Sequence, residues 1–312
     1  MIIEIDSVYS FHQIGKRENQ EDSRYPDVDN PPTDTPVFVV CDGVGGCEKG
    51  EVASANVCES IGKSMANHDS QEEFSDKDFQ NVLRKAYDSL DKASNESTRG
   101  MGTTLTFLTF HSNGVMAAHI GDSRIYQIRP GEGLIYRSED HSLVNALLRS
   151  GNISPDQVKG HPKSNVITRC MSANDGVRER DDATAVNLSD VAPGDYFLLC
   201  SDGVTSEWDD EDLIDLYSSD RSDEEKIKIL AEKSAESADN NTAIQIHVGL
   251  VTVNPEIESE IEFYETMENS DETETIVRTQ HLNKRDETPH DITAAPETKS
   301  SKLKSFFNRL FK

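Results

Sequence analysis

Four aspartates lie beside stretches that alternate like β-strands, next to glycine or small polar residues. Asp42 ends the run FVVCD before GVGG, and Asp202 ends YFLLCSD before a glycine. Asp122 follows GVMAAHIG, and Asp239 precedes the run AIQIHV. Strand ends hold side chains rigidly, and glycine lets the backbone approach a ligand closely. Gathered carboxylates repel one another unless cations lie between them, and hard oxygen ligands suit Mg²⁺ or Mn²⁺.

Each of these motifs has a simple structural interpretation when it is taken alone. An Asp-Gly pair is usually a turn, the GDSR at 121–124 fits a hairpin turn, and the DNN at 239–241 fits a loop. Two apolar strands that both run into Asp-Gly are harder to explain in this way. The set, rather than any one motif, therefore predicts a metal site.

The segment RENQED at residues 17–22 supplies more groups of the same chemistry. The guanidinium of Arg17 is a planar fork that suits phosphate oxygens. Glu21 and Asp22 follow close behind it and could join a metal site. Alone, such a charged run is usually a solvated loop.

Hydrophobic periodicity predicts the elements that would position these residues. Helical spacing predicts two long helices at 51–68 and 76–93. Short apolar runs rich in β-branched residues predict strands, at 36–41, 103–110, 114–120, 123–128, 196–200 and 243–248. Strands, then two helices, then a run of strands favour antiparallel sheets with helices packed outside.

Residues 141–174 form a region of a different kind. LVNALLRSG predicts a short helix that Gly151 stops, and ISP at 153–155 predicts a second start with a serine cap and a proline in the first turn. We expect these short helices to form a flap over the site.

Composition limits the classes of function. The 312 residues include 31 Lys and Arg and 58 Asp and Glu, a formal net charge of −27. Such a chain repels nucleic acid, and no basic stripe interleaved with aromatic residues is present. Five scattered cysteines without C-x-x-C argue against a disulfide framework and a zinc site, and they favour a reducing cytoplasm. No signal peptide is evident, and no run approaches the about 20 apolar residues of a membrane span.

A change of composition near Pro255 predicts the domain organisation. We expect residues 1–253 to form a catalytic domain and residues 254–298 to form a disordered acidic and polar linker. Between residues 255 and 275 there are nine acidic residues and no Lys or Arg. Residues 299–312 predict a basic amphipathic helix, with Leu303, Phe306, Phe307, Leu310 and Phe311 on one face. Such a helix would dock peripherally on a membrane, in a partner groove or back on the acidic domain.

The linker also carries threonines among acidic residues, in SDETETIVRT at 270–279. A kinase could phosphorylate them, and a phosphothreonine-binding partner could then dock there. An inert linker is the alternative.

Eight segments stand in an order that resembles the protein phosphatase 2C family, the metal-dependent serine/threonine protein phosphatases. They are RENQED, VFVVCDGVGG, GTTLTF, IGDSRIY, DHSLVNALLRSG, HPKSNVITR, FLLCSDGVTSEW and DNNTAIQI. The form DGVGG resembles the bacterial branch. The resemblance implies an α+β fold, a β-sandwich of two antiparallel sheets flanked by α-helices. It also implies a centre of two Mn²⁺ or Mg²⁺ ions, a short helical flap and a monomeric catalytic domain.

The resemblance further implies which residues hold the two ions. Asp42 would bridge both, and Gly43 would bind one of them through its carbonyl oxygen. Asp202 and Asp239 would ligate the other ion.

Four more residues take roles from the same resemblance. Glu21 would contact the centre through water, and Asp122 would help to bind a weaker third ion. Asp22 would support the site from behind. Arg17 would grip the phosphate of a phosphoserine or phosphothreonine in a phosphoprotein substrate.

The implied reaction is attack on phosphorus by a water that the cations activate, opposing a serine/threonine kinase in signalling. No cysteine nucleophile is needed. Val44 stands where many eukaryotic members carry a histidine proposed as general acid, so protonation of the leaving group stays open. His141 and His161 are candidates by location only, and a structural role suits both better.

Two other functions compete with this one. A pseudophosphatase would bind phosphoproteins without turnover, but a scaffold has no need of the full ligand set. A two-metal hydrolase of small phosphodiesters is disfavoured only by the family resemblance. The substrate protein, the cognate kinase, the metal used and the oligomeric state stay open.

Overall fold

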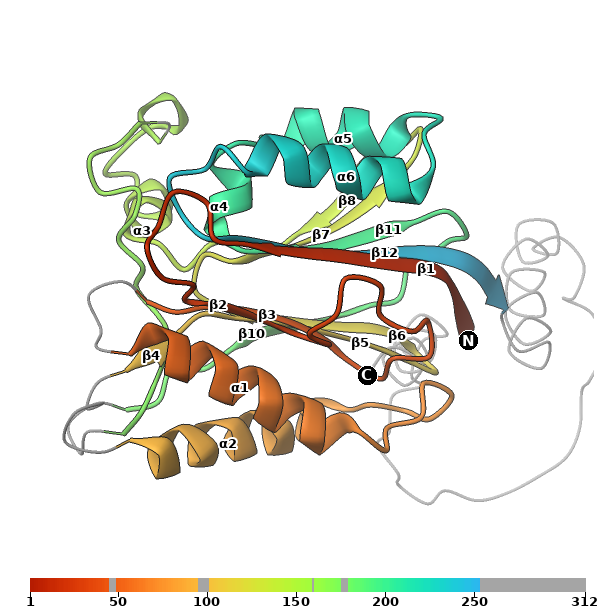
Figure 1. Cartoon of the computed structure of the whole chain (residues 1–312), viewed down its shortest axis with the longest axis horizontal. Helices are drawn as coiled ribbons and strands as arrows, with labels where there is room; N and C mark the ends of the chain where they lie inside the picture. Colours follow the sequence, from red (N-terminus) through yellow and green to blue (C-terminus); the bar gives the residue numbers. More distant parts are fainter. Residues whose placement is uncertain (45–48, 95–100, 159, 175–178, 253–312) are drawn as a thin grey trace, which may run out of the picture. The chain divides into compact units, whose positions relative to one another are not determined.

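Apolar residues on both faces of the central strands require a covering layer on each side. In β3 (Phe38–Asp42), Phe38 and Val40 pack into one core, and Val39 and Cys41 pack into another. Successive side chains of a strand point to opposite faces, so a strand that is apolar throughout must be buried on both. The result is four layers, in which two sheets lie face to face and helices cover each outer face (Figure 1).

The structure, a computed structural model, describes residues 1–44, 49–94, 101–158, 160–174 and 179–252. The unit that contains them runs from Met1 to Thr252. The linker predicted at 254–298 and the helix predicted at 299–312 lie outside the described residues.

Two five-stranded antiparallel sheets form the sandwich. The first has the order β1 (Ile2–Gln13), β12 (Asn241–Thr252), β11 (Tyr196–Cys200), β7 (Arg124–Arg129) and β8 (Gly133–Arg137). The second has the order β10 (Thr184–Leu188), β6 (Gly114–Ile120), β5 (Leu105–His111), β3 and β2 (Asp22–Tyr25). A small ribbon joins β4 (Gly102–Thr103) to β9 (Met171–Ser172).

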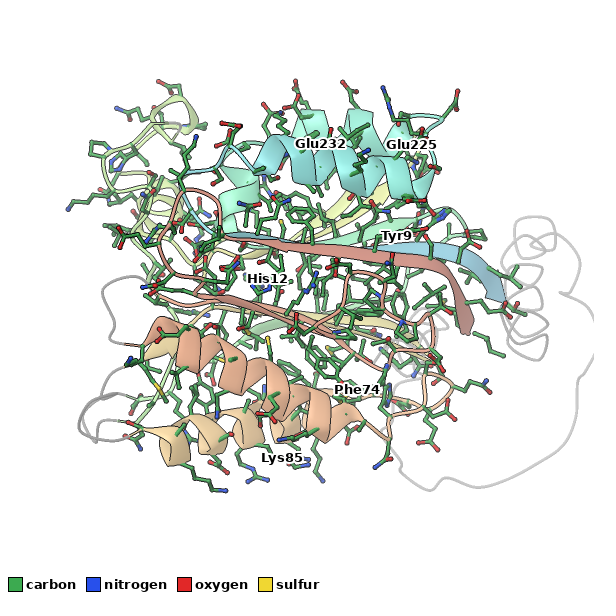
Figure 2. All side chains as sticks on the ribbon, viewed as in Figure 1. Tyr9, His12, Phe74, Lys85, Glu225 and Glu232 are labelled. Atoms are coloured by element: carbon green, nitrogen blue, oxygen red, sulfur yellow. The ribbon has the colours of Figure 1, made fainter. Side chains whose placement is uncertain are left out.

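Helices cover both outer faces of the sandwich. The second sheet packs against α1 (Gly50–Met65) and α2 (Asp76–Ala93), and the first against α5 (Asp210–Ser218) and α6 (Asp223–Ser234). Figure 2 shows Phe74 between the α1–α2 layer and the sheet, and Lys85, Glu225 and Glu232 on the outer surfaces of the helices. Each helix therefore presents an apolar stripe inward and charges outward.

The sequence predicted the two long helices and the strands β3, β5, β6, β7, β11 and β12, but not β1, β2, β8 or β10. The first helix ends at Met65 rather than at residue 68. The backbone N–H of His68 donates to the carbonyl of Met65 at 2.8 Å, and the His68 ring hydrogen-bonds the carbonyl of Phe110 at 3.1 Å. This turn draws the chain back toward the sheet and ends the helix.

The flap region contains less regular structure than the rest. It holds α3 (Leu143–Arg149) and a 3₁₀ turn, Pro155–Gln157, which Ser154 caps as predicted; Ser142 caps α3. Its two arms meet at the base, where Leu143 N–H donates to Val166 and Thr168 N–H donates to His141. Figure 1 places α3, β4 and α4 (Asp202–Thr205) at one end of the sandwich. No helix among the described residues is both long and apolar enough to cross a membrane.

Candidate metal centre

The predicted carboxylates meet in one cavity at this end of the sandwich. Asp42 ends β3, Asp202 begins α4 directly after β11, and Asp239 precedes β12. The cavity has a volume of about 230 Å³. Seven of the eight predicted site residues line it: Arg17, Glu21, Asp42, Gly43, Asp122, Asp202 and Asp239. Residues more than two hundred positions apart are thus neighbours because both sheets end here.

Burial and mutual repulsion make these carboxylates resist ionisation. Burial raises the pKa of Asp42 well above its ordinary value, and the charges of Asp22 and Asp202 raise it further. Burial and then Asp202 raise the pKa of Asp122 to about 7. Burial and then Asp239 raise the pKa of Asp202. So much negative charge in one buried place requires a compensating positive charge.

Divalent cations fit this donor set. The Oδ1 atom of Asp202 is buried and has no hydrogen-bond partner among the described residues. A buried carboxylate oxygen without a partner is costly, and a cation would satisfy it. Carboxylate and carbonyl oxygens make up the set, and these ligands suit Mg²⁺ or Mn²⁺ rather than zinc.

Gly43 has no room for a side chain. A Cβ atom there would lie 2.5 Å from the carbonyl carbon of Gly50 and 2.8 Å from the carbonyl oxygen of Glu21. Its N–H donates to that same Glu21 oxygen at 3.0 Å. The glycine therefore holds the loop after β3 close to the segment that carries Glu21.

Asp22 lies behind the cavity and ties three segments together. It pairs with Asp42 across the β2–β3 ladder. Its Oδ2 atom accepts hydrogen bonds from Ser201 at 2.8 Å and from Thr242 at 2.7 Å. Ser201 precedes Asp202, and Thr242 belongs to β12. Burial raises the pKa of Asp22 to about 7, although both hydrogen bonds lower it.

Arg17 stands at the mouth of the cavity. Its Nη2 donates to Asp239 Oδ2 at 2.6 Å, and 47% of its side chain is exposed. This hydrogen bond raises the pKa of Arg17 above the ordinary value of arginine, so the guanidinium is always charged. A half-exposed cation at the rim of an anionic cavity can meet an incoming anion.

Two residues that the sequence analysis did not single out, Thr104 and Asn240, hold the segments around the cavity in place. Thr104 Oγ1 accepts from Asp42 N–H at 2.9 Å and shares a hydrogen bond of 2.7 Å with Ser123 Oγ. Asn240 Oδ1 accepts from Glu21 N–H at 2.9 Å, and its Nδ2 donates to the carbonyls of residues 14 and 19. The only sequence signal was their position inside GTTLTF and DNNTAIQI.

His141 and His161 do not line the cavity. His141 Nδ1 accepts from Gly121 N–H at 3.2 Å, so its proton lies on Nε2, which donates to Thr184 Oγ1 at 2.9 Å. Burial, with His119 beside it, lowers the pKa of His141 to about 4. His161 Nδ1 accepts from Lys163 N–H within the flap. Both rings make structural hydrogen bonds.

The cysteines next to the aspartates are inert. Cys41 and Cys200 are fully buried. Burial raises the pKa of Cys41 well above its ordinary value and that of Cys200 to about 12. A thiol that stays protonated is a poor nucleophile.

An oxygen-lined cavity between two sheets, with an arginine at its mouth, defines a divalent-metal hydrolase of phosphate esters. The profile of the family described as Protein phosphatase 2C matches residues 28–241. The chain belongs to the protein phosphatase 2C family.

Relatives of known name agree with this assignment. The protein phosphatase PhpP of Streptococcus pneumoniae is 33% identical over 231 residues, which cover 70% of this chain and 87% of that protein. The serine/threonine phosphatase stp of Listeria monocytogenes is 30% identical over 205 residues, 64% of this chain and 78% of that protein.

Solved structures extend the agreement to the fold. The serine/threonine phosphatase PstP/Ppp of Mycobacterium tuberculosis superposes with a TM-score of 0.65 at 27% identity, over 78% of this chain and 98% of that one. The catalytic domain of PstP in complex with two manganese ions gives a TM-score of 0.62 at 27% identity, over 78% of this chain and 98% of that one. The predicted α+β sandwich is confirmed.

Proposed function

We propose that this protein hydrolyses phosphoserine and phosphothreonine esters of phosphoproteins at the carboxylate cavity, using Mn²⁺ or Mg²⁺. One observation carries the proposal: Asp42, Asp202 and Asp239 converge from three strand ends on one cavity with Arg17 at its mouth. The relatives are named serine/threonine phosphatases, and one was solved with two manganese ions. Nothing among the described residues favours a pseudophosphatase.

The chain supplies the ligands as follows. Asp42 would serve as a ligand to both ions, and Gly43 would offer its carbonyl oxygen to one of them. Asp202 and Asp239 would hold the other ion. When bound, the two cations lower the pKa of a shared water and offset negative charge on the phosphate oxygens.

The remaining residues position these groups and the substrate. Glu21 would contact the centre through water, and Asp122 would help to hold a weaker third ion. Asp22 keeps the strand ends in register through Ser201 and Thr242. The metal centre is thus fixed before the substrate arrives, which avoids reorganisation during reaction.

Arg17 orients the substrate phosphate. Its guanidinium already faces the cavity through Asp239. With a phosphate in the cavity, the guanidinium would donate parallel hydrogen bonds to its oxygens. The phosphorus is then held in line with the water that attacks it.

Phosphate release from a phosphothreonine peptide tests this function. We expect release with Mn²⁺ or Mg²⁺ and none with chelator. Asp42→Asn should lower kcat at least about 100-fold, because the loss of a bridging ligand removes several kcal/mol of transition-state stabilisation. Equal release in chelator and in metal, or an active Asp42→Asn, would refute the proposed function.

We further propose that the segment after residue 253 sets the partners and the location of the enzyme. The threonines of 270–279 would link it to a kinase or to a phosphothreonine-binding partner. The basic amphipathic segment 299–312 would dock on a membrane surface or a partner groove. A fluorescent fusion that distributes in cells identically with and without residues 299–312 would contradict the docking role.

A further inference from the structure

A second cavity adjoins the metal centre. Its volume is about 340 Å³, and it shares Asp122, Asn165 and Asp202 with the first. The flap forms one wall, the end of α4 forms another, and β7 and β8 contribute Arg124 and Arg137. A hollow of this size next to the reacting phosphate can take a neighbouring side chain of a bound peptide.

Most of the charges around this second cavity are already neutralised by a partner. Arg124 binds Asp140 with two parallel hydrogen bonds of 2.7 Å, and its third nitrogen donates to Tyr126 Oη at 3.1 Å. Asp122 and Asp202 belong to the metal centre, where cations offset their charge. These four charged groups therefore leave little net charge for a peptide to meet.

Arg137 also has an ion-pair partner, Asp210, but unlike Arg124 it keeps unused hydrogen-bond donors. It ends β8, and its Nη1 atom donates to Asp210, the first residue of α5. Its side chain is 40% exposed. Within the described part of the chain its Nε and Nη2 atoms have no acceptor. It is thus an arginine with unused donors, on the wall of a cavity that shares three lining residues with the metal centre.

We propose that the second cavity binds an acidic side chain of the substrate that flanks the phosphorylated residue, and that Arg137 recognises it. This rests on the proposed function. A carboxylate or a second phosphate would accept from Nε and Nη2 while Asp210 keeps Nη1. The chain has a net charge of −27 and repels acidic peptides over most of its surface. The free Nε and Nη2 donors of Arg137 therefore give such substrates a favoured orientation, although Asp210 already pairs with its Nη1.

The test compares phosphothreonine peptides that differ at one flanking position at a time, with glutamate, a non-hydrolysable phosphonate analogue of phosphoserine, glutamine or lysine there. We measure kcat/KM for the full chain with Mn²⁺. At one position we expect the acidic peptides to exceed the glutamine peptide by about two- to fivefold, the range of a partly exposed charge pair, and mainly through KM. Glutamate and phosphonate arms show which acid is preferred, and added salt should shrink the effect.

Three variants locate the effect. Arg137→Gln should remove the acidic preference. Asp210→Asn should increase it, because Nη1 is released. Arg84→Gln is the matched control, since it removes an exposed arginine that pairs only with Asp88 on α2, and it should leave the preference unchanged.

The outcomes separate the two proposals. Release from neutral peptides without an acidic preference at any position, or a preference that survives in Arg137→Gln, overturns this inference alone. No release from any peptide overturns the proposed function as well. If Arg137→Gln does not fold, as judged by its thermal melt, the response to Asp210→Asn and to salt decides.

Discussion

Thr103 and Thr104, which directly precede β5, hold Asp42 in position by hydrogen bonds. Thr104 Oγ1 accepts the N–H of Asp42 at 2.9 Å, and Thr103 Oγ1 donates to its carbonyl at 2.9 Å. Thr104 N–H donates to the same carbonyl at 2.8 Å. Both threonines are buried. The position of the central carboxylate therefore depends on these two threonines as well as on its own strand.

Thr104→Val should weaken both stability and catalysis. Valine has the same shape but leaves the N–H of Asp42 without its acceptor, so we expect a loss of about 1–3 kcal/mol in the free energy of unfolding. We also expect a lower kcat and weaker activation by Mn²⁺. Denaturant unfolding and a Mn²⁺ titration of phosphate release measure the two effects.

Thr109→Val is the control for that experiment. Thr109 is buried on β5, the strand that begins directly after Thr104. It donates to the carbonyl of Pro36 at 2.6 Å, far along β5 from the metal centre. It should lose similar stability and keep its response to Mn²⁺. An unaltered Mn²⁺ response in Thr104→Val would show that the threonine does not position Asp42.

The sequence could predict the carboxylates but not the residues that support them. Asp42 and Asp202 could be identified from the sequence because Asp42 ends an apolar strand and Asp202 lies two residues after one. This is a local pattern. Thr104 and Asn240 act through hydrogen bonds to partners 62 and 219 positions away. No local periodicity carries that information, because it depends on which strands become neighbours.

At the scale of elements, Asp223 joins α6 to the first sheet. It is the first residue of the helix, after a Ser222 cap. Its carboxylate accepts from Ser7 of β1 at 2.6 Å, from Tyr196 of β11 at 2.5 Å and from His247 of β12 at 2.8 Å. One side chain thus links the N-terminus of a helix to three strands, where a negative charge is also favoured by the helix dipole.

Asp223→Asn should make stability less dependent on pH. Burial raises the pKa of Asp223, but the hydrogen bonds from His247, Ser7 and Tyr196 outweigh it, so the pKa lies well below its ordinary value. A carboxylate with a depressed native pKa stabilises the fold above its unfolded pKa, near 4, and loses this as pH falls through the native pKa.

The variant should therefore be less stable than wild type at pH 7, by about 1–2 kcal/mol for the weakened hydrogen bonds. The difference should shrink as pH falls below about 4, in the window that the depressed pKa defines. Urea unfolding at a series of pH values measures it. Glu224→Gln, an exposed acidic residue in the same helical turn, should cost much less. A constant difference at every pH would contradict the assigned ionisation.

Predictability also differs between elements. The helix at 76–93 was predicted with both ends correct, because Ser75 forms a capping box with Asp78 and the apolar stripe is regular. β1 was missed although it is a long strand. Its outer half, IIEIDS, is only partly buried and its partner β12 lies at the far end of the domain, so its pairing is not a local property.

The helices α5 and α6 were missed for a different reason. Both begin with dense acidic turns that read as solvated surface, and the few apolar positions follow later. Leu213, Leu216 and Tyr217 lie on one face at helical spacing and are buried. That spacing was a usable signal, hidden by the charge around it.

At the scale of the molecule, three apolar cores hold the described residues together. One lies between the second sheet and α1–α2, one between the sheets, and one between the first sheet and α5–α6. All their members lie between Met1 and Thr252. The predicted end of the catalytic domain at residue 253 stays a prediction that truncation can test.

A chain that ends at residue 253 should fold and keep its kcat. The physical reason is that the three apolar cores and the carboxylate cavity are built from residues between Met1 and Thr252. A cooperative thermal melt and phosphate release from a phosphothreonine peptide check this against the full chain. Loss of either would show that the acidic and basic segments after residue 253 are part of the catalytic unit.

We expect the carboxylates at the strand ends to hold two divalent cations. Calorimetric titration of the metal-free full chain with Mn²⁺ tests this most directly. We expect two tight sites in wild type, the loss of both in Asp42→Asn, since that residue would serve both ions, and the loss of one in Asp202→Asn. Two tight sites that survive in Asp42→Asn would contradict this expectation.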